Sequence, residues 1–93
     1  MSKTEHIKLA LERKIENTKT AIQQMNDEVI ELVRENQKPN ILHHNYNANQ
    51  SRINWLQREI EYTCAKLKTL REVMYMIDNI MELKESDANE TAN

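Results

Sequence analysis

The residues best suited to chemistry lie in one polar stretch, NQKPNILHHNYNANQ, at residues 36–50. His43 and His44 stand there beside Asn45 and Tyr46, and imidazole is the commonest nitrogen ligand for protein-bound metals. A zinc site needs three or four converging ligands, yet this stretch contains no cysteine and no carboxylate. We therefore predict that it is a polar connection that holds no metal and no other cofactor.

Motifs for catalysis are missing from the sequence as well. It has no Ser–His–Asp or Cys–His arrangement, no HExxH motif and no glycine-rich phosphate loop, since the chain contains no glycine. Cys64 is the only cysteine, which excludes an internal disulfide and any cluster of several cysteines around a metal. We expect this thiol to be a small apolar filler. The sequence thus predicts a protein that is not an enzyme and has no small-molecule substrate.

Composition narrows the class of protein further. Of 93 residues, 39% are apolar, 30% charged and 4% aromatic, which is typical of soluble proteins built from long helices. The net charge of −2 gives no overall attraction to nucleic acid, although Lys66, Lys68 and Arg71 form a short basic patch near Tyr62. No apolar run approaches the length of a signal peptide or a membrane span. We expect a soluble intracellular protein, cytoplasmic or nuclear, that binds no membrane and has nucleic acid only as a remote alternative partner.

Two long segments carry seam residues at alternating steps of four and three, the heptad spacing of a coiled coil. This spacing predicts helices over about residues 3–37 and 48–84, joined by a polar bend over residues 38–47. The seam residues are Leu11, Ile15, Thr18, Ile22, Met25, Val29 and Leu32 in the first segment, and Ile53, Leu56, Ile60, Thr63, Leu67, Leu70, Met74, Ile77 and Met81 in the second.

The ends of the helices carry signals of their own. Pro39 should end the first helix, because proline disfavours helical geometry at the residue before it. Ser2 followed by Glu5 predicts a capping box at the start of the first helix. Asn47 followed by Gln50 predicts a weaker box at the start of the second. Both helices are therefore predicted to have defined beginnings.

The fold class that follows is all-α: an antiparallel two-helix coiled-coil hairpin over residues 1–85, completed into a helical bundle by self-association or by a partner. Two helices alone cannot fully bury their seam, so a lone hairpin should be marginally stable. Ile41 and Leu42 in the bend are expected to fold down over the end of the hairpin. Residues 86–93 are acidic, small and polar, and we expect them to be a disordered tail.

Two registers keep the seam apolar: facing residue numbers add either to 85 or, after a slip of one heptad, to 92. The first register places Glu12 near Arg71, which is attractive, and Glu28 near Glu59, which is repulsive. The second register brings together more like charges. We therefore predict the first, although exposed charge pairs contribute only about 0–1 kcal/mol each.

A second apolar face lies on the second helix, outside the seam. With Ile53 at heptad position a and Leu56 at d, large apolar residues recur at positions c and g, which flank the d row. Ile7, at position g of the first helix, should extend this face near the open end of the hairpin. The residues predicted to contact a partner are Trp55, Tyr62, Val73, Met76, Ile80 and Leu83.

The predicted function is that of a non-enzymatic helical interaction protein, most simply a small structural or adaptor subunit acting through this face. The alternative is a small helical inhibitor, sequestering protein or chaperone that binds an enzyme, a nucleic-acid machine or a signalling ligand. The two differ in what covers the face. A subunit should be unstable without its partner, whereas an inhibitor or chaperone should be a well-folded homo-oligomer by itself.

Overall fold

The structure, a computed structural model, describes the backbone of residues 2–92 and the side chains of residues 2–85. The first helix, α1, spans Lys3–Asn36. The Ser2 hydroxyl accepts a hydrogen bond from the backbone N–H of Glu5 at 3.2 Å, and the Glu5 carboxylate accepts one from the backbone N–H of Ser2 at 3.4 Å. The predicted capping box is confirmed, and it satisfies donors that the first turn of a helix leaves free.

The bend occupies residues 37–42 and is shorter than predicted. The second helix, α2, spans His43–Ala92 and so begins five residues before the predicted start at residue 48. Its first turn is closed by a hydrogen bond of 3.0 Å from the backbone N–H of Tyr46 to the carbonyl of Leu42. The polar composition therefore indicated a longer connection than the chain needs to reverse its direction.

The predicted helix start at Asn47 and Gln50 is wrong, because both residues lie inside α2. The amide of Gln50 donates a hydrogen bond along the helix to Asn54 at 3.2 Å. Asparagine is less favourable than alanine inside a helix by only about 0.7 kcal/mol. Contacts with α1 outweigh this preference, since Asn49 is half-buried and bonded to Asn36.

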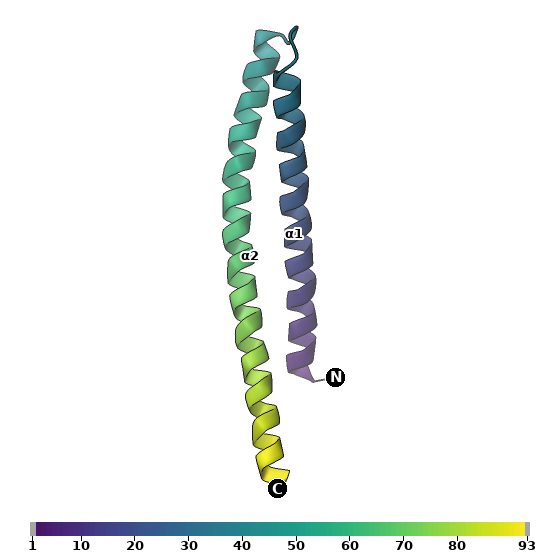
Figure 1. Ribbon diagram of the computed structural model, residues 1–93, viewed down its shortest axis with the longest axis vertical. Helices are drawn as coiled ribbons and strands as arrows, with labels where there is room; N and C mark the ends of the chain where they lie inside the picture. The colour runs from purple at the N-terminus through teal and green to yellow at the C-terminus, as the bar shows by residue number, and fades with distance from the viewer. Residues whose placement is uncertain (1, 93) are drawn as a thin grey trace.

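α2 also continues beyond its predicted end at residue 84. The sequence predicts a disordered tail over residues 86–93, whereas the backbone of residues 86–92 continues the helix. This segment contains neither proline nor glycine, the residues that most often stop a helix. Its side chains and all of Asn93 lie outside the described residues. Figure 1 shows α2 extending well past the N-terminal end of α1.

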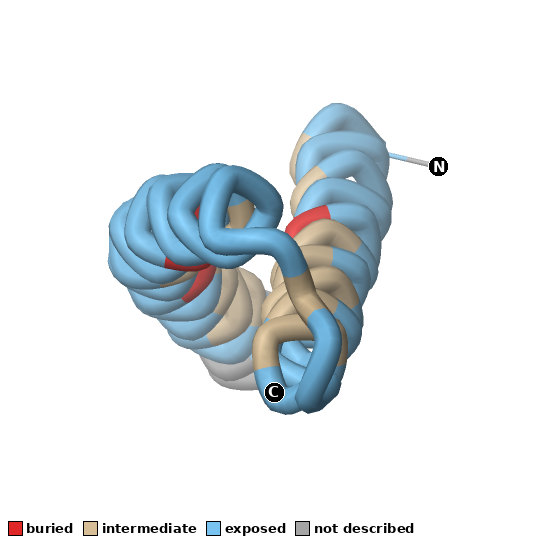
Figure 2. The backbone as a smooth tube through the Cα atoms, turned by 90° about the horizontal axis from the view of Figure 1, so that it is seen from above, coloured by how far each residue is buried: buried red, intermediate tan, exposed pale blue. Residues whose placement is uncertain are grey.

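α1 and α2 pack side by side in an antiparallel hairpin (Figure 1). Ile15, Ile53, Leu56 and Leu67 are buried between them, and Leu56 is only 1% exposed. Every other residue of the predicted seam is buried or half-buried, so the seam is confirmed residue by residue. Outside this line both helices are largely exposed, as the pale blue backbone in Figure 2 shows. The core of the protein is a single seam.

Contacts across the seam establish its register. The Asn49 amide donates to the Asn36 amide oxygen at 3.0 Å, and the Lys8 ammonium lies 2.8 Å from the Asp78 carboxylate. The residue numbers of these pairs add to 85 and 86, which confirms the predicted register and excludes the slip to 92.

The charged pairs beside the seam differ from those predicted. The Glu28 carboxylate, predicted to lie near Glu59, accepts hydrogen bonds of 2.6 and 3.1 Å from the Arg52 guanidinium. Among residues 2–85, no ion pair joins Glu12 to Arg71. Arginine reaches along the helix and binds a carboxylate through two parallel hydrogen bonds, a geometry that one-to-one pairing of facing positions does not anticipate.

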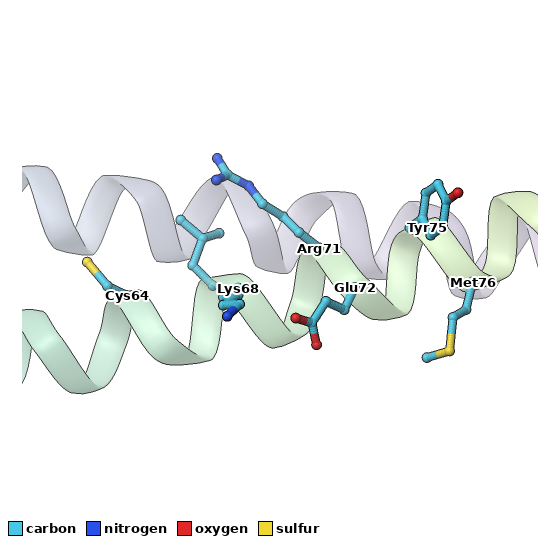
Figure 3. A pocket seen from close by; sticks show the side chains of 7 residues that line it. Cys64, Lys68, Arg71, Glu72, Tyr75 and Met76 are labelled. Atoms are coloured by element: carbon cyan, nitrogen blue, oxygen red, sulfur yellow. The ribbon is translucent and has the colours of Figure 1, made fainter.

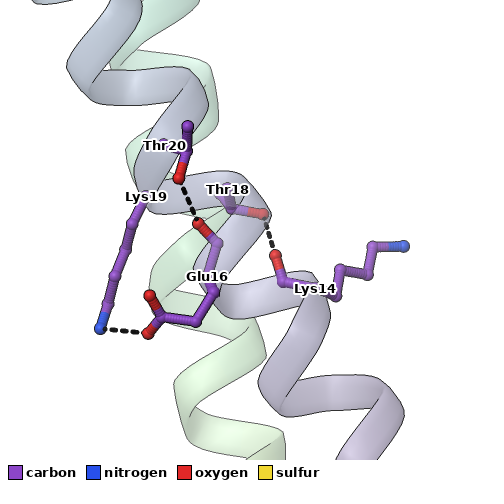
Figure 4. A network of polar contacts seen from close by, with 5 residues as sticks. All are labelled: Lys14, Glu16, Thr18, Lys19 and Thr20. Carbon is purple, nitrogen blue, oxygen red and sulfur yellow. Dashed lines mark hydrogen bonds and ion pairs between the residues drawn. The ribbon is translucent and has the colours of Figure 1, made fainter.

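Two threonines in the seam satisfy their hydroxyl groups locally. Thr18 donates to the backbone carbonyl of Lys14 at 2.7 Å, as Figure 4 shows, and Thr63 donates to that of Glu59 at 2.7 Å. Nearby on α1, Glu16 accepts through its backbone from Thr20 and through its carboxylate from Lys19. No buried side-chain nitrogen or oxygen within the described part of the chain lacks a hydrogen-bond partner. The polar seam positions therefore leave no unpaired polar group.

Candidate functional site

The bend, where the sequence first suggested chemistry, ties the two helices together. Asn36 donates to the backbone carbonyl of Tyr46 at 3.4 Å and accepts from Asn49 at 3.0 Å. Both His43 and His44 are exposed. Within the described residues no three His, Cys, Asp or Glu side chains come together in a group able to hold a metal ion. The polar contacts found at the bend serve its architecture.

The two aliphatic residues of the bend behave differently from each other. Ile41 is half-buried and folds toward the end of the hairpin, as predicted. Leu42 is 68% exposed, so the prediction that it also folds down is wrong. It is the last residue before α2, and there its side chain is left in solvent. The bend therefore presents one large apolar side chain at its surface.

The six residues predicted to contact a partner form what we call the apolar stripe: Trp55, Tyr62, Val73, Met76, Ile80 and Leu83. All lie on α2 and outside the seam. Five of them are exposed, with Tyr62 at 68% and Leu83 at 65%, while Val73 is half-buried. Ile7 of α1 is also exposed, near the end where Val73 and Ile80 lie. The stripe is thus a row of large apolar side chains, of which Tyr62, Met76 and Leu83 have more than half of their surface in solvent.

Positions c and g of both helices share one side of the hairpin, which we call the c/g face. A depression of about 410 Å³ is lined by Thr18 and Thr63 of the seam, flanked by Lys14, Asn17, Ala21 and Lys66 from the c and g positions. A neighbouring depression of about 310 Å³ is lined by Lys14, Tyr62, Ala65, Lys66, Thr69 and Leu70. Small side chains in the middle of the hairpin leave these hollows, and two lysines from opposite helices border both of them.

Trp55 is held in place from one side. The Arg52 guanidinium lies 4.6 Å from the centroid of its ring, a cation–π contact. The same guanidinium is hydrogen-bonded to Glu28 of α1, at 2.6 and 3.1 Å. The indole is therefore positioned by a chain of contacts that begins on the other helix. Sequence reasoning placed Trp55 on the stripe but did not anticipate this support, because it compared only directly facing charges.

Apolar residues on the other side of the hairpin escaped the sequence prediction. Leu9, Ile30, Val33 and Tyr75 occupy heptad positions b and e, and all four are exposed. Figure 3 shows Tyr75 on α2 beside a depression of about 610 Å³ whose lining residues all come from this one helix and include Met76 of the apolar stripe. Three of the four exposed side chains share position b, but b positions between them carry polar residues such as Glu16 and Lys68, so no apolar row revealed them. We call this side the b/e face.

Acidification should test the contact that supports Trp55. The hydrogen bonds from Arg52 lower the pKa of the Glu28 carboxyl below its ordinary value of 4.5. A lowered folded-state pKa stabilises the fold above the unfolded pKa, and this stabilisation is lost as pH falls through the folded pKa. We expect Glu28→Gln to lower the melting temperature near neutral pH, and this difference from the wild type to shrink below pH 4.5. A difference that does not change with pH would show that the carboxylate charge is not responsible.

Neither helix, over the part of the chain that the structure describes, has an apolar stretch long enough to cross a membrane. Comparison of the chain with models of protein families, with curated proteins and with solved structures gives no match.

Proposed function

We propose that the protein is a non-enzymatic helical interaction protein, a small structural or adaptor subunit whose binding surface is the apolar stripe. The observation that supports this most is the exposure of Trp55, Tyr62 and Met76 in one row beside a seam that is already formed without them. Contiguous exposed apolar surface on one side of a protein typically marks an interaction site. The stripe has this character toward the open end, where Val73, Met76, Ile80 and Leu83 lie, whereas Trp55 and Tyr62 are flanked by charged residues.

The types of residue in the stripe fit this proposal. Tryptophan and tyrosine are enriched among residues that dominate binding at protein interfaces, because they bury a large rigid surface and keep a polar group at the edge. Full burial of a large apolar side chain contributes about 1.5–3 kcal/mol, so covering even part of the stripe would stabilise a complex appreciably. The hairpin, held by a single seam, would also be stabilised by whatever binds there.

Two tyrosines on α2 make a matched test of the proposal. Tyr62 belongs to the stripe and Tyr75 to the b/e face, and both are 68% exposed. We expect Tyr62→Glu to weaken association, because it brings a charge into the proposed contact surface. Tyr75→Glu makes the same chemical change on the other side and should leave association almost unaltered. Both variants should keep wild-type helicity, since neither residue belongs to the seam.

The measurement is the molar mass in solution over a range of protein concentrations, with the circular dichroism of each variant as the control for folding. Association here means either self-association or binding to a partner recovered with the wild-type chain. Equal association by the two variants would show that the stripe is ordinary exposed surface. Selective loss in Tyr62→Glu would support its role as the contact surface.

A further inference from the structure

Charged and apolar residues occupy different parts of the c/g face. On the bend side of its middle the face carries the carboxylates of Glu28, Glu31, Glu35 and Glu59, and Glu28 is paired with Arg52. On the other side of its middle it carries Lys14 and Lys66, which border the same two depressions. Among residues 2–85, neither lysine belongs to an ion pair. Toward the open end the face is apolar, with Ile7, Val73, Met76, Ile80 and Leu83.

Both lysines and two of the glutamates, Glu31 and Glu59, are related by a common centre. On α2, Glu59 and Lys66 are centred between residues 62 and 63. On α1, the midpoint of Lys14 and Glu31 lies between residues 22 and 23. Facing residue numbers of the two helices add to 85, so this midpoint lies opposite residues 62 and 63 of α2. Reversing one copy about this centre would therefore bring each lysine opposite a glutamate of the other copy, on both helices at once. A surface with this property is complementary to itself.

We propose that the partner on the apolar stripe is a second copy of this chain. The two c/g faces meet across a twofold axis perpendicular to the helices near Tyr62, with α2 antiparallel to α2 and α1 antiparallel to α1. The product is a four-helix bundle whose bends lie at opposite ends. This inference rests on the proposed function, because it identifies what covers the stripe. A well-folded dimer of this chain alone is also what the inhibitor or chaperone alternative predicts.

Shape along the face agrees with charge. Residue 55 faces residue 70 in this arrangement, so the indole of Trp55 meets the depression of about 310 Å³ bordered by Thr69 and Leu70 of the second copy. At the ends, Leu83 faces Leu42, the side chain that the bend leaves 68% exposed. The open end of one hairpin thus covers the bend of the other, where Met76 and Ile80 meet the polar residues Asn49 and Asn45. The exposed Leu42, unexplained within one chain, acquires a contact.

The size of the face is sufficient for a stable dimer. α1 has 34 residues and so extends about 51 Å at 1.5 Å per residue. The hairpin is 19 Å across its second axis, which makes the face about 1,000 Å². Specific interfaces commonly bury about 800 Å² on each partner. By contrast, a twofold axis parallel to the helices would bring the lysines of both copies to the same level and align like charges.

Cross-linking tests the orientation directly. In a Cys64→Ser background, the double variant Leu42→Cys with Leu83→Cys should form intermolecular disulfides under mild oxidation. Within one chain these positions are 41 residues apart along α2, about 62 Å, so an intramolecular bond is excluded. Each single variant should remain un-cross-linked in the antiparallel dimer. Cross-linking of the single variants, or none in the double variant of a dimeric protein, would overturn the proposed arrangement.

Charge exchange tests the occupant. Lys14→Glu with Lys66→Glu should weaken the dimer roughly 10- to 100-fold, because four attractive pairs become repulsive. Adding Glu31→Lys and Glu59→Lys to the same chain restores opposite charges across the axis and should return the dissociation constant to within about threefold of the wild type. Sedimentation equilibrium measures the constants, and circular dichroism checks folding.

The outcomes separate this inference from the proposed function. A monomeric wild type would overturn self-pairing. So would a quadruple charge variant whose dimer dissociates as readily as that of the Lys14→Glu, Lys66→Glu double variant. If Tyr62→Glu still selectively reduced binding to another protein, the stripe would remain a binding surface with a different occupant. If Tyr62→Glu and Tyr75→Glu behaved alike, the stripe itself would lose its role. Restored dimerisation of the quadruple charge variant supports a second copy as the partner on the stripe, since a different protein would keep its own charges.

Discussion

Leu56→Asp is expected to unfold the hairpin, with loss of most of its helical circular dichroism. Leu56 is the most deeply buried side chain described, at 1% exposure, and belongs to the single seam that joins the helices. Removing a buried leucine alone costs about 2–5 kcal/mol, and an unpaired charge in its place adds to that cost. Native proteins have about 0.05–0.15 kcal/mol of stability per residue, or roughly 5–14 kcal/mol for 93 residues. The substitution therefore removes most or all of the free energy that keeps the hairpin folded.

The control for this prediction is Gln57→Asp, which introduces the same residue one position further along α2. Gln57 is exposed, so the carboxylate stays in water and helicity should be retained. Thermal melts followed by circular dichroism at equal protein concentration compare the variants. A Leu56→Asp protein that melts like the wild type would mean that the seam does not hold the two helices together.

Trp55→Ala is expected to raise the dissociation constant of the dimer about 30- to 1,000-fold, the effect of truncating an aromatic anchor worth about 2–4 kcal/mol. Trp55 lies outside the seam and is 44% exposed, so the fold of each hairpin should persist. The Arg52 guanidinium, 4.6 Å from the ring centroid, restrains the indole before association. A side chain that is already ordered loses little conformational entropy on binding, which makes its contribution larger.

Tyr75→Ala is the comparison, because it truncates an aromatic side chain that is even more exposed but lies on the b/e face. Sedimentation equilibrium gives the dissociation constants, and near-wild-type helicity of both variants excludes unfolding as the cause. If both truncations weakened the dimer equally, aromatic exposure in general would be responsible for association. If neither did, Trp55 would not be an anchor.

The seam was predictable from the sequence because the same heptad spacing recurs along both helices. Sixteen positions keep one spacing, so local exceptions such as Thr18 and Thr63 do not shift the period, and every position is buried or half-buried. The capping box was equally predictable, since Ser2 and Glu5 act within a single turn. Both features depend on local geometry that a helix imposes on any sequence.

The start of α2 and the side contacts were not predictable in the same way. The first turns of α2 are built from residues with weak helix preference, and the Asn36–Asn49 contact that supports them joins residues 13 apart. Arg52 reaches Glu28 along the helix, which depends on the length and rotamer of its side chain. Leu9, Ile30 and Tyr75 share heptad position b, but the b positions between them are polar, so no continuous apolar row marks their shared face.

Cross-helix pairs in this hairpin increase steadily in sequence separation from the bend outward: 13 residues for Asn36 and Asn49, 24 for Glu28 and Arg52, and 70 for Lys8 and Asp78. Closing a loop of 70 residues directly costs about 1.5 kcal/mol more chain entropy than closing one of 13. Once the pairs nearest the bend have formed, each later pair closes only a small additional loop. The chain should therefore fold as a zipper that starts at the bend and opens first at the termini, where the capping box at Ser2 opposes fraying of α1.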